Sequence, residues 1–255
     1  MHLDLHHPVL VFACDIDGCL AAEGHAAYDL DALRAIAERN RASVDDPLVP
    51  ALTLVTGRPH GYVDALMQAL DVRLPVSFEN GAGLATRHPY EAWLVPEAEA
   101  GRVRLERAQR LLDERDDVFT QLGKVASMSV LDAHGERDVD ALARMLRMWV
   151  REHELDLVVD PSTDCVNLLL PSVDKAVGLE ALCETLDLVP EAVAGIGDSH
   201  GDVGWLRACG VSIAPANAVA EVRSSVTVVS TQRDVAATLE AYDALIAANR
   251  ALAAR

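Results

Sequence analysis

Two aspartates separated by one residue follow a short apolar run near the start of the chain, and their type and spacing could support chemistry. The run, residues 9–13, is typical of a strand buried on both faces, and Asp15 and Asp17 come just after it. Side chains two positions apart in an extended segment point to the same side, so both carboxylates can face one site. Such a pair supplies a nucleophile and a general acid or base, and Mg²⁺ is the usual cation that relieves its repulsion beside phosphate. A strand followed by an Asx-rich turn explains the same residues equally well.

Further polar clusters occupy comparable places along the chain. Thr56 follows the apolar run 51–55, Lys175 opens a helical segment, and Asp198 and Asp202 follow the apolar run 192–196. Parallel strands joined by right-handed crossovers present their carboxyl ends at one edge of a sheet, so these clusters can converge. Together they contain the nucleophile, acid, hydroxyl donor, cation and metal carboxylates that phosphoryl transfer needs.

Each residue also has a structural explanation when it is taken alone. Thr56 could simply end a strand, and Asp202 could cap a helix. A solvated lysine at a helix start would oppose the helix dipole, which favours a functional role for Lys175.

The strand–helix alternation that carries these clusters is interrupted once. Residues 85–165 change to an α+β pattern with helices over 96–114 and 138–152 and closely spaced strands, and the first pattern returns after residue 171. We therefore predict an α/β fold: a doubly wound, Rossmann-like parallel sheet core formed by residues 1–84 and 166–255, with an inserted smaller α+β cap domain formed by residues 85–165. The other expected core elements are helices over 29–42, 62–70 and 174–186 and strands over 51–55, 75–78, 192–196, 211–214 and 226–229; the expected cap strands are 125–131, 157–160 and 165–170.

Composition limits the classes of function. The 255 residues carry a formal net charge of −18 without a run of Lys or Arg, which argues against nucleic acid as a partner. No apolar run reaches the length of a membrane span, and residues 1–7 lack the basic start and apolar core of a secretory signal. The five cysteines show no metal-binding or CxxC spacing and fit reduced thiols. We expect a cytoplasmic protein, a monomer or homodimer, with no membrane partner.

The clusters in this order resemble the haloacid dehalogenase superfamily. The segments that carry this resemblance are DIDGC, LVTGRP, a single Lys and GIGDSHGD. The segments ENGAG, VDKAVGL and PANA are similar to the sugar-phosphatase-like branch of the superfamily. That branch includes archaeal-type phosphoglycolate phosphatase, sucrose-phosphatase and mannosyl-3-phosphoglycerate phosphatase. The inserted block matches the branch in position and general composition only.

The resemblance implies a role for each matching residue. Asp15 would form an aspartyl-phosphate, Asp17 would protonate the leaving alcohol and activate water, Thr56 would hydrogen-bond the phosphoryl oxygens, and Lys175 would offset charge. Mg²⁺ would be held by Asp15, Asp198 and the backbone carbonyl of Asp17, with Asp202 supporting the metal or Lys175. The residues expected near the substrate are Gly57, Arg58, Asn80 and Asn217.

Two positions depart from the family pattern. Gly201 stands where an Asn usually precedes the second Asp of the metal loop, and Ser199 or His200 could replace the lost hydrogen bond. Cys19 takes a position often held by Thr or Val. Neither change removes a group that does chemistry.

These observations predict a Mg²⁺-dependent phosphatase acting on a small phosphorylated metabolite, a sugar phosphate or a phosphoglycolate-like ester. A receiver-like phospho-acceptor protein also combines acidic residues with Thr and Lys, but the chain is too long for one such domain. A phosphomutase remains an alternative within the superfamily. A dehalogenase is opposed by Asp17, since carbon–halogen cleavage needs no acid for an alcohol, and nothing in the residues supports a catalytically silent binding protein.

Overall fold

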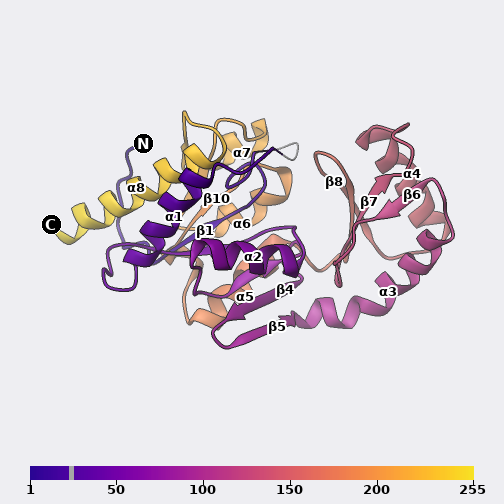
Figure 1. Ribbon diagram of the computed structural model, residues 1–255, viewed down its shortest axis with the longest axis horizontal. Coiled ribbons are helices and arrows are strands. Elements are labelled where there is room, and N and C mark those ends of the chain that lie inside the picture. The colour runs from indigo at the N-terminus through magenta and orange to yellow at the C-terminus, as the bar shows by residue number, and fades with distance from the viewer. Residues whose placement is uncertain (23–25) are drawn as a thin grey trace.

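The computed structural model describes residues 1–22 and 26–255, and a five-stranded parallel sheet organises its core (Figure 1). The strand order is β12-β11-β10-β1-β2, so the first strand lies inside the sheet rather than at its edge. The register pairs Cys14 of β1 with Ile196 of β10 and with Leu54 of β2. The strands are β1 (Val11–Cys14), β2 (Ala51–Leu54), β10 (Val193–Ile196), β11 (Val211–Ala214) and β12 (Val228–Val229).

Helices cover both faces of this sheet because its strands are apolar on both sides. Phe12 and Cys14 of β1 belong to the apolar cluster that includes the inner faces of α1, α2 and α8, whereas Val11 and Ala13 belong to the cluster that includes α5 and α6. On the first face the rings of Phe12 and Tyr242 lie 5.1 Å apart. The helices of this core are α1 (Leu30–Ala42), α2 (His60–Leu70), α5 (Lys175–Leu186), α6 (Val203–Ala208), α7 (Ala220–Ser225) and α8 (Asp234–Ala253), with 3₁₀ turns at Pro190–Ala192 and His200–Asp202.

A small antiparallel sheet, β3-β4-β5, extends the core beside β2. An isolated parallel bridge between Val55 and Ser77 connects it to the end of β2. The sequence pattern predicts β3 but not β4 or β5, because no residue of β5 is buried and its apolar residues do not alternate. The bounds are β3 (Val76–Phe78), β4 (Gly83–Arg87) and β5 (Tyr90–Leu94).

A second antiparallel sheet, β6-β7-β9-β8, lies at the opposite end of the molecule from both chain termini (Figure 1). Leu142, Leu146 and Trp149 are buried on one side of α4, which packs against β8 and β9. The elements of this unit are α3 (Pro96–Asp113), β6 (Val118–Thr120), β7 (Met128–Asp132), α4 (Val139–Glu152), β8 (Val158–Pro161) and β9 (Val166–Leu169).

The predicted fold class, a doubly wound α/β core with an inserted smaller α+β cap, is confirmed by this arrangement. Strand β9 pairs with β7 and β8, so the four-stranded sheet includes residues as far as Leu169. The division of the chain at residues 84/85 and 165/166 stays a prediction. Within the described residues, we find no helix with the length and hydropathy that a bilayer crossing needs.

Two buried asparagines attach helices to the strands of the core. Asn40 on α1 donates to the carbonyls of Leu70 and Asp71 and accepts from the backbone N–H of Leu52. Asn249 on α8 accepts from the N–H of Val9 at 2.9 Å and donates to the carbonyls of Val9 and Leu48. These side chains satisfy backbone groups at the strand entrances that no ladder bond reaches.

Replacing Asn249 with Ala should leave these backbone groups without partners. We expect the free energy of unfolding, measured by urea titration, to fall by about 2–4 kcal/mol, because each buried polar group left unpaired costs about 1–3 kcal/mol. The matched control is Arg250→Ala on the same helix, which removes only an exposed ion pair with Asp46 and should cost less than about 1 kcal/mol. Equal losses in the two variants would contradict this role of Asn249.

Candidate active site

Three of the predicted residues form one buried ion-pair chain at the carboxyl end of the parallel sheet. The Nζ of Lys175 donates to Asp15 Oδ2 at 2.8 Å and to Asp202 Oδ1 at 2.6 Å. All three side chains are buried, and Asp202 has no exposed surface. Lys175 is placed here because it is the first residue of α5. Asp174, the residue before it, caps the helix by accepting from the N–H groups of Ala176 and Val177.

Burial and charge together set the protonation of this chain. Burial raises the pKa of Asp15 to about 7, with Asp202 and Asp17 adding to the shift and Lys175 opposing it. Burial alone would lower the pKa of Lys175, but the Asp15 and Asp202 carboxylates outweigh it and raise that pKa above its ordinary value. Asp15 is therefore only partly ionised at neutral pH, and a further positive charge nearby would favour its carboxylate form.

Asp198 lies beside Asp15 because their strands are adjacent. The N–H of Asp15 donates to the carbonyl of Ile196 at 3.0 Å, which continues the β1–β10 ladder to the two strand ends. Carboxylate oxygens of Asp15, Asp198 and Asp202 lie within 4.8 Å of one another. These three carboxylates and the Lys175 ammonium leave an excess of two negative charges, which matches one divalent cation with oxygen ligands.

Asp202 holds the loop that carries Asp198. Its Oδ2 accepts from the N–H groups of Asp198 and Ser199 and from the hydroxyl of Ser199, while its Oδ1 also accepts from Trp205 Nε1. The Ser199 hydroxyl supplies a loop-orienting bond beside Gly201, as the sequence had suggested. Because donors already occupy both oxygens of Asp202, the geometry fits support of Lys175 and the loop better than direct metal ligation.

Gly18 leaves the space that Asp198 occupies. Its φ is +71°, in the left-handed region, and a Cβ built on it would lie 2.0 Å from Asp198 Oδ2. The chain therefore requires glycine here for two reasons, its backbone conformation and the close approach of the carboxylate.

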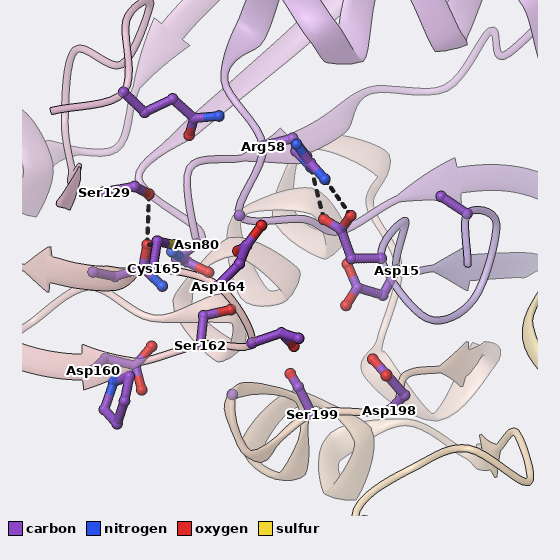
Figure 2. A pocket seen from close by; sticks show the side chains of 18 of the residues that line it. Asp15, Arg58, Asn80, Ser129, Asp160, Ser162, Asp164, Cys165, Asp198 and Ser199 are labelled. Carbon is purple, nitrogen blue, oxygen red and sulfur yellow. Dashed lines mark hydrogen bonds and ion pairs between the residues drawn. The ribbon is translucent and has the colours of Figure 1, made fainter. Parts of the chain in front are cut away.

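Asp17 is paired with Arg58 in a two-pronged ion pair. Arg58 Nε and Nη2 donate to the two oxygens of Asp17 at 2.8 and 2.5 Å (Figure 2). The guanidinium carbon lies 4.8 Å from the centre of the Tyr62 ring, which holds the arginine from its other side. Asp17 is thus more exposed than Asp15 and is balanced by its own cation.

Three predicted residues lie together on the loops after β2 and β3. Thr56 is fully buried, its hydroxyl accepts from the N–H of Arg58, and its carbonyl accepts from the N–H of Asn80. Gly57 permits the close approach of Asn80, because a Cβ there would meet the Asn80 side chain at 2.8 Å. Within the described residues, Asn80 Nδ2 is buried without a hydrogen-bond partner, so it has a donor to offer.

Asn217 is engaged elsewhere. Its Nδ2 donates to the carbonyl of Gly18, and its Oδ1 accepts from the N–H of Asp234 at the start of α8. It is absent from the residues found to line the cavity described next, so a substrate contact by Asn217 stays a prediction.

A cavity of about 510 Å³ opens between the catalytic edge and the four-stranded sheet. Figure 2 shows Asp15 and Asp198 on one side of it and Ser129, Asp160 and Cys165 on the other. The lining residues from the core include Asp15, Asp17, Gly57, Arg58, Asn80, Lys175 and Asp198, and those from the other side include Gln121, Lys124, Ser129, Asp160, Ser162, Asp164, Cys165 and Asn167.

Comparison with known sequences identifies relatives over most of the chain. A sequence profile of the haloacid dehalogenase-like hydrolase family matches residues 137–241. A phosphoglycolate phosphatase from Methanococcoides burtonii is 26% identical over 208 residues, which are 80% of this chain and 82% of that protein. Another from Methanopyrus kandleri is 26% identical over 215 residues, covering 84% and 88% of the two chains.

Solved structures share the fold over nearly the whole length. A Thermoplasma acidophilum protein superposes with a TM-score of 0.75 at 20% identity and covers 94% of this chain and 99% of its own. The sucrose-phosphatase of Synechocystis superposes with a TM-score of 0.67 at 16% identity over 94% of this chain and 98% of its own. The predicted resemblance to the haloacid dehalogenase superfamily is confirmed by these matches. The expected enzyme class, a phosphatase, is confirmed with it.

One buried group at the site leaves no sign in the sequence. Glu79 is fully buried, and its carboxylate accepts from the N–H groups of Val125 and Ala126 and from the hydroxyl of Ser127. The φ angles of Glu79 and Asn80 are +50° and +56°, an unusual run for two residues with side chains. The Glu79 side chain bonds residues 125–127 whereas the Asn80 side chain lines the cavity, an arrangement that the ENGAG segment does not reveal by itself.

Gly18→Ala should displace Asp198 from this hydrolase's acidic cluster, because the added methyl overlaps the carboxylate. We expect the rise in Tm on adding Mg²⁺ to be lost, while circular dichroism keeps its helical signal. The matched control is Gly61→Ala in α2, where nothing lies within 4 Å of the added Cβ and helix propensity improves by up to about 1 kcal/mol. If Gly18→Ala kept the full rise in Tm on adding Mg²⁺, the close contact between Gly18 and the Asp198 carboxylate would not matter for cation binding.

Proposed function

We propose that this haloacid dehalogenase-like hydrolase is a Mg²⁺-dependent phosphatase that cleaves a small phosphorylated metabolite through an aspartyl-phosphate on Asp15. The substrate would be a sugar phosphate or a phosphoglycolate-like ester. The observation that carries the proposal is the buried chain of Asp15, Lys175 and Asp202 beside Asp198, at one wall of a cavity large enough for such an ester. The names of its relatives, phosphoglycolate phosphatase and sucrose-phosphatase, support both substrate classes.

In the first step a carboxylate oxygen of Asp15 forms a bond to phosphorus while the bond from phosphorus to the ester oxygen breaks. Asp17 gives its proton to the departing alkoxide, so an alcohol leaves and the phosphoryl group stays on Asp15. The ammonium of Lys175 stabilises the negative charge on Asp15 and on the transferring group.

In the second step water attacks phosphorus and the bond to Asp15 breaks. Asp17, now ionised, takes the proton of that water, which regenerates Asp15 and releases phosphate. Arg58, which pairs with Asp17 in this structure, would turn toward the anionic substrate when Asp17 acts on the leaving group.

The donor set fits the implied cation. Asp15 and Asp198, with the backbone carbonyl of Asp17, are hard oxygen ligands. A divalent cation would balance the excess of two negative charges in the cluster. When bound, Mg²⁺ would supply the positive charge that favours ionised Asp15 and offsets charge on the phosphoryl oxygens. Asp202 would act through Lys175 and the loop rather than on the ion.

The phosphoryl oxygens would be bound from the loops after β2 and β3. The hydroxyl hydrogen of Thr56 remains available, since its contact with Arg58 uses the oxygen as an acceptor. Asn80 Nδ2 offers a second donor at the cavity wall. Gly57 lets these groups approach one another, and Arg58 adds positive charge.

The remaining expectations concern the whole molecule. We propose that the four-stranded sheet with α3 and α4 acts as a cap that excludes water and contacts the leaving group, since its residues form the far wall of the cavity.

The five cysteines are free, which suits a reducing compartment such as the cytoplasm. We retain the expectation of a monomer or homodimer.

Asp15→Asn should abolish turnover without unfolding the protein, because only the nucleophile is lost. We expect phosphate release from a small phosphomonoester to fall at least about 10³-fold. The matched control is Asp45→Asn, the same change at a solvent-exposed position just after α1, and this variant should turn over normally. Turnover near the wild-type rate in Asp15→Asn would exclude the covalent mechanism.

Removing divalent cations should stop the reaction, since the buried carboxylates then lack the charge that ionises Asp15. We expect phosphate release to cease after exhaustive chelation and to return with Mg²⁺ but not with Ca²⁺, whose looser coordination disturbs in-line geometry. Asp198→Asn should weaken the Mg²⁺ dependence of both the rate and Tm. Undiminished turnover in chelator would refute the metal requirement.

A further inference from the structure

The chain contains only two lysines, and both line the same cavity. Lys175 lies at the wall that carries Asp15, whereas Lys124 lies on the segment between β6 and β7 at the other wall. The other 20 of the 22 basic residues are arginines, so both lysine side chains of the chain lie at this cavity. A compact ammonium is a point charge with three rotatable donors, suited to binding a small anion.

The ammonium of Lys124 is held by a directed pair of hydrogen bonds. Its Nζ donates to the hydroxyl of Ser129 at 2.6 Å, and that hydroxyl donates to Asn167 Oδ1 at 2.7 Å. Ser129 and Asn167 are buried on neighbouring strands β7 and β9, so the bonds come from a fixed surface. Two of the three ammonium hydrogens remain for a ligand.

No carboxylate among residues 1–22 and 26–255 lies within ion-pair distance of Lys124. Burial lowers the pKa of this lysine, with nearby charges on Glu79 and Asp17 opposing the shift. A partly buried cation that has no ionic partner in the described part of the chain is costly, and an anion entering the cavity would remove that cost.

Glu79 fixes where this cation stands relative to the catalytic edge. Its carboxylate, at the end of β3, accepts from the N–H groups of Val125 and Ala126, the two residues that follow Lys124. The backbone that carries the cation is therefore attached to the core rather than only to its own sheet. In Figure 2 Ser129, the partner of Lys124, lies across the cavity from Asp15 and Asp198.

We propose that Lys124 binds a carboxylate on the leaving alcohol of the substrate, an inference that rests on the proposed phosphatase function. Phosphorus then lies at the Lys175 wall and the carboxylate at the Lys124 wall, so each ammonium faces one anionic end of a small molecule. A single carboxylate suits the site better than a second phosphoryl group, because Asp160 also lines this part of the cavity and repels a dianion more strongly than a monoanion. A neutral sugar would leave the ammonium unpaired.

The test compares two esters of equal carbon number, 2-phosphoglycolate and ethyl phosphate, in wild type and Lys124→Met. We expect wild type to prefer the carboxylate ester in kcat/KM, and Lys124→Met to reduce that preference by roughly 10- to 100-fold, the loss expected for one charged hydrogen bond. The change should lie mainly in KM, since the carboxylate is remote from the breaking bond. Lys124→Arg should keep most of the preference, and Arg144→Met, an exposed cation on α4, should keep all of it.

The outcomes separate this inference from the proposed function. Release of phosphate from neither ester by wild type, nor from a sugar phosphate, would overturn both. Turnover of both esters at equal efficiency, or preference for a neutral sugar phosphate, would support the proposed phosphatase function. Either result would overturn the proposal that Lys124 binds a carboxylate of the substrate. An unchanged preference in Lys124→Met would show that another group binds the leaving alcohol.

Discussion

The buried ammonium of Lys175, shared between Asp15 and Asp202, is the interaction on which the rest of the site depends. Removing three charges from water costs several kcal/mol for each ion, so the arrangement persists only if every charged atom is satisfied. The structure meets this condition through Asp202, whose two oxygens accept from Lys175, Trp205, Ser199 and the N–H of Asp198. The loop that positions Asp198 and the cation that faces Asp15 are thereby held by one carboxylate.

The same chain also explains why the site is not self-sufficient. Asp15 is raised to a pKa of about 7 by its own burial and by neighbouring acids, although Lys175 lies at 2.8 Å. Asp15 therefore becomes fully ionised at neutral pH only with additional positive charge. In the proposed mechanism, cation binding, ionisation of Asp15 and phosphoryl transfer are thereby coupled.

Sequence reasoning predicted which strand ends share one edge of the sheet because its signals are local. Apolar runs followed by polar residues marked the ends of β1, β2 and β10, and these strands are indeed parallel neighbours. The pattern of β5 was missed because an exposed edge strand has no buried face to produce alternation. The domain boundaries stay a prediction, since β9 follows β8 after a short hairpin and its apolar residues suit either sheet.

Contacts between distant segments could not be predicted in this way. No pattern in the sequence places Lys124 beside Ser129 or shows that its side chain is partly buried; only the fold does. Glu79 bonds residues 46 to 48 positions further along the chain, and no spacing rule connects them. The Asp17–Arg58 pair and the structural role of Asn217 likewise depend on side-chain directions that a sequence does not specify.

The central claim is that Asp15, held by Lys175, attacks phosphorus directly. The most direct test is the stereochemical course at phosphorus, measured with a phosphomonoester made chiral by oxygen isotopes and hydrolysed in water of the third isotope. Two successive in-line displacements, one by Asp15 and one by water, predict net retention of configuration. Net inversion would mean a single displacement by water and would contradict the account.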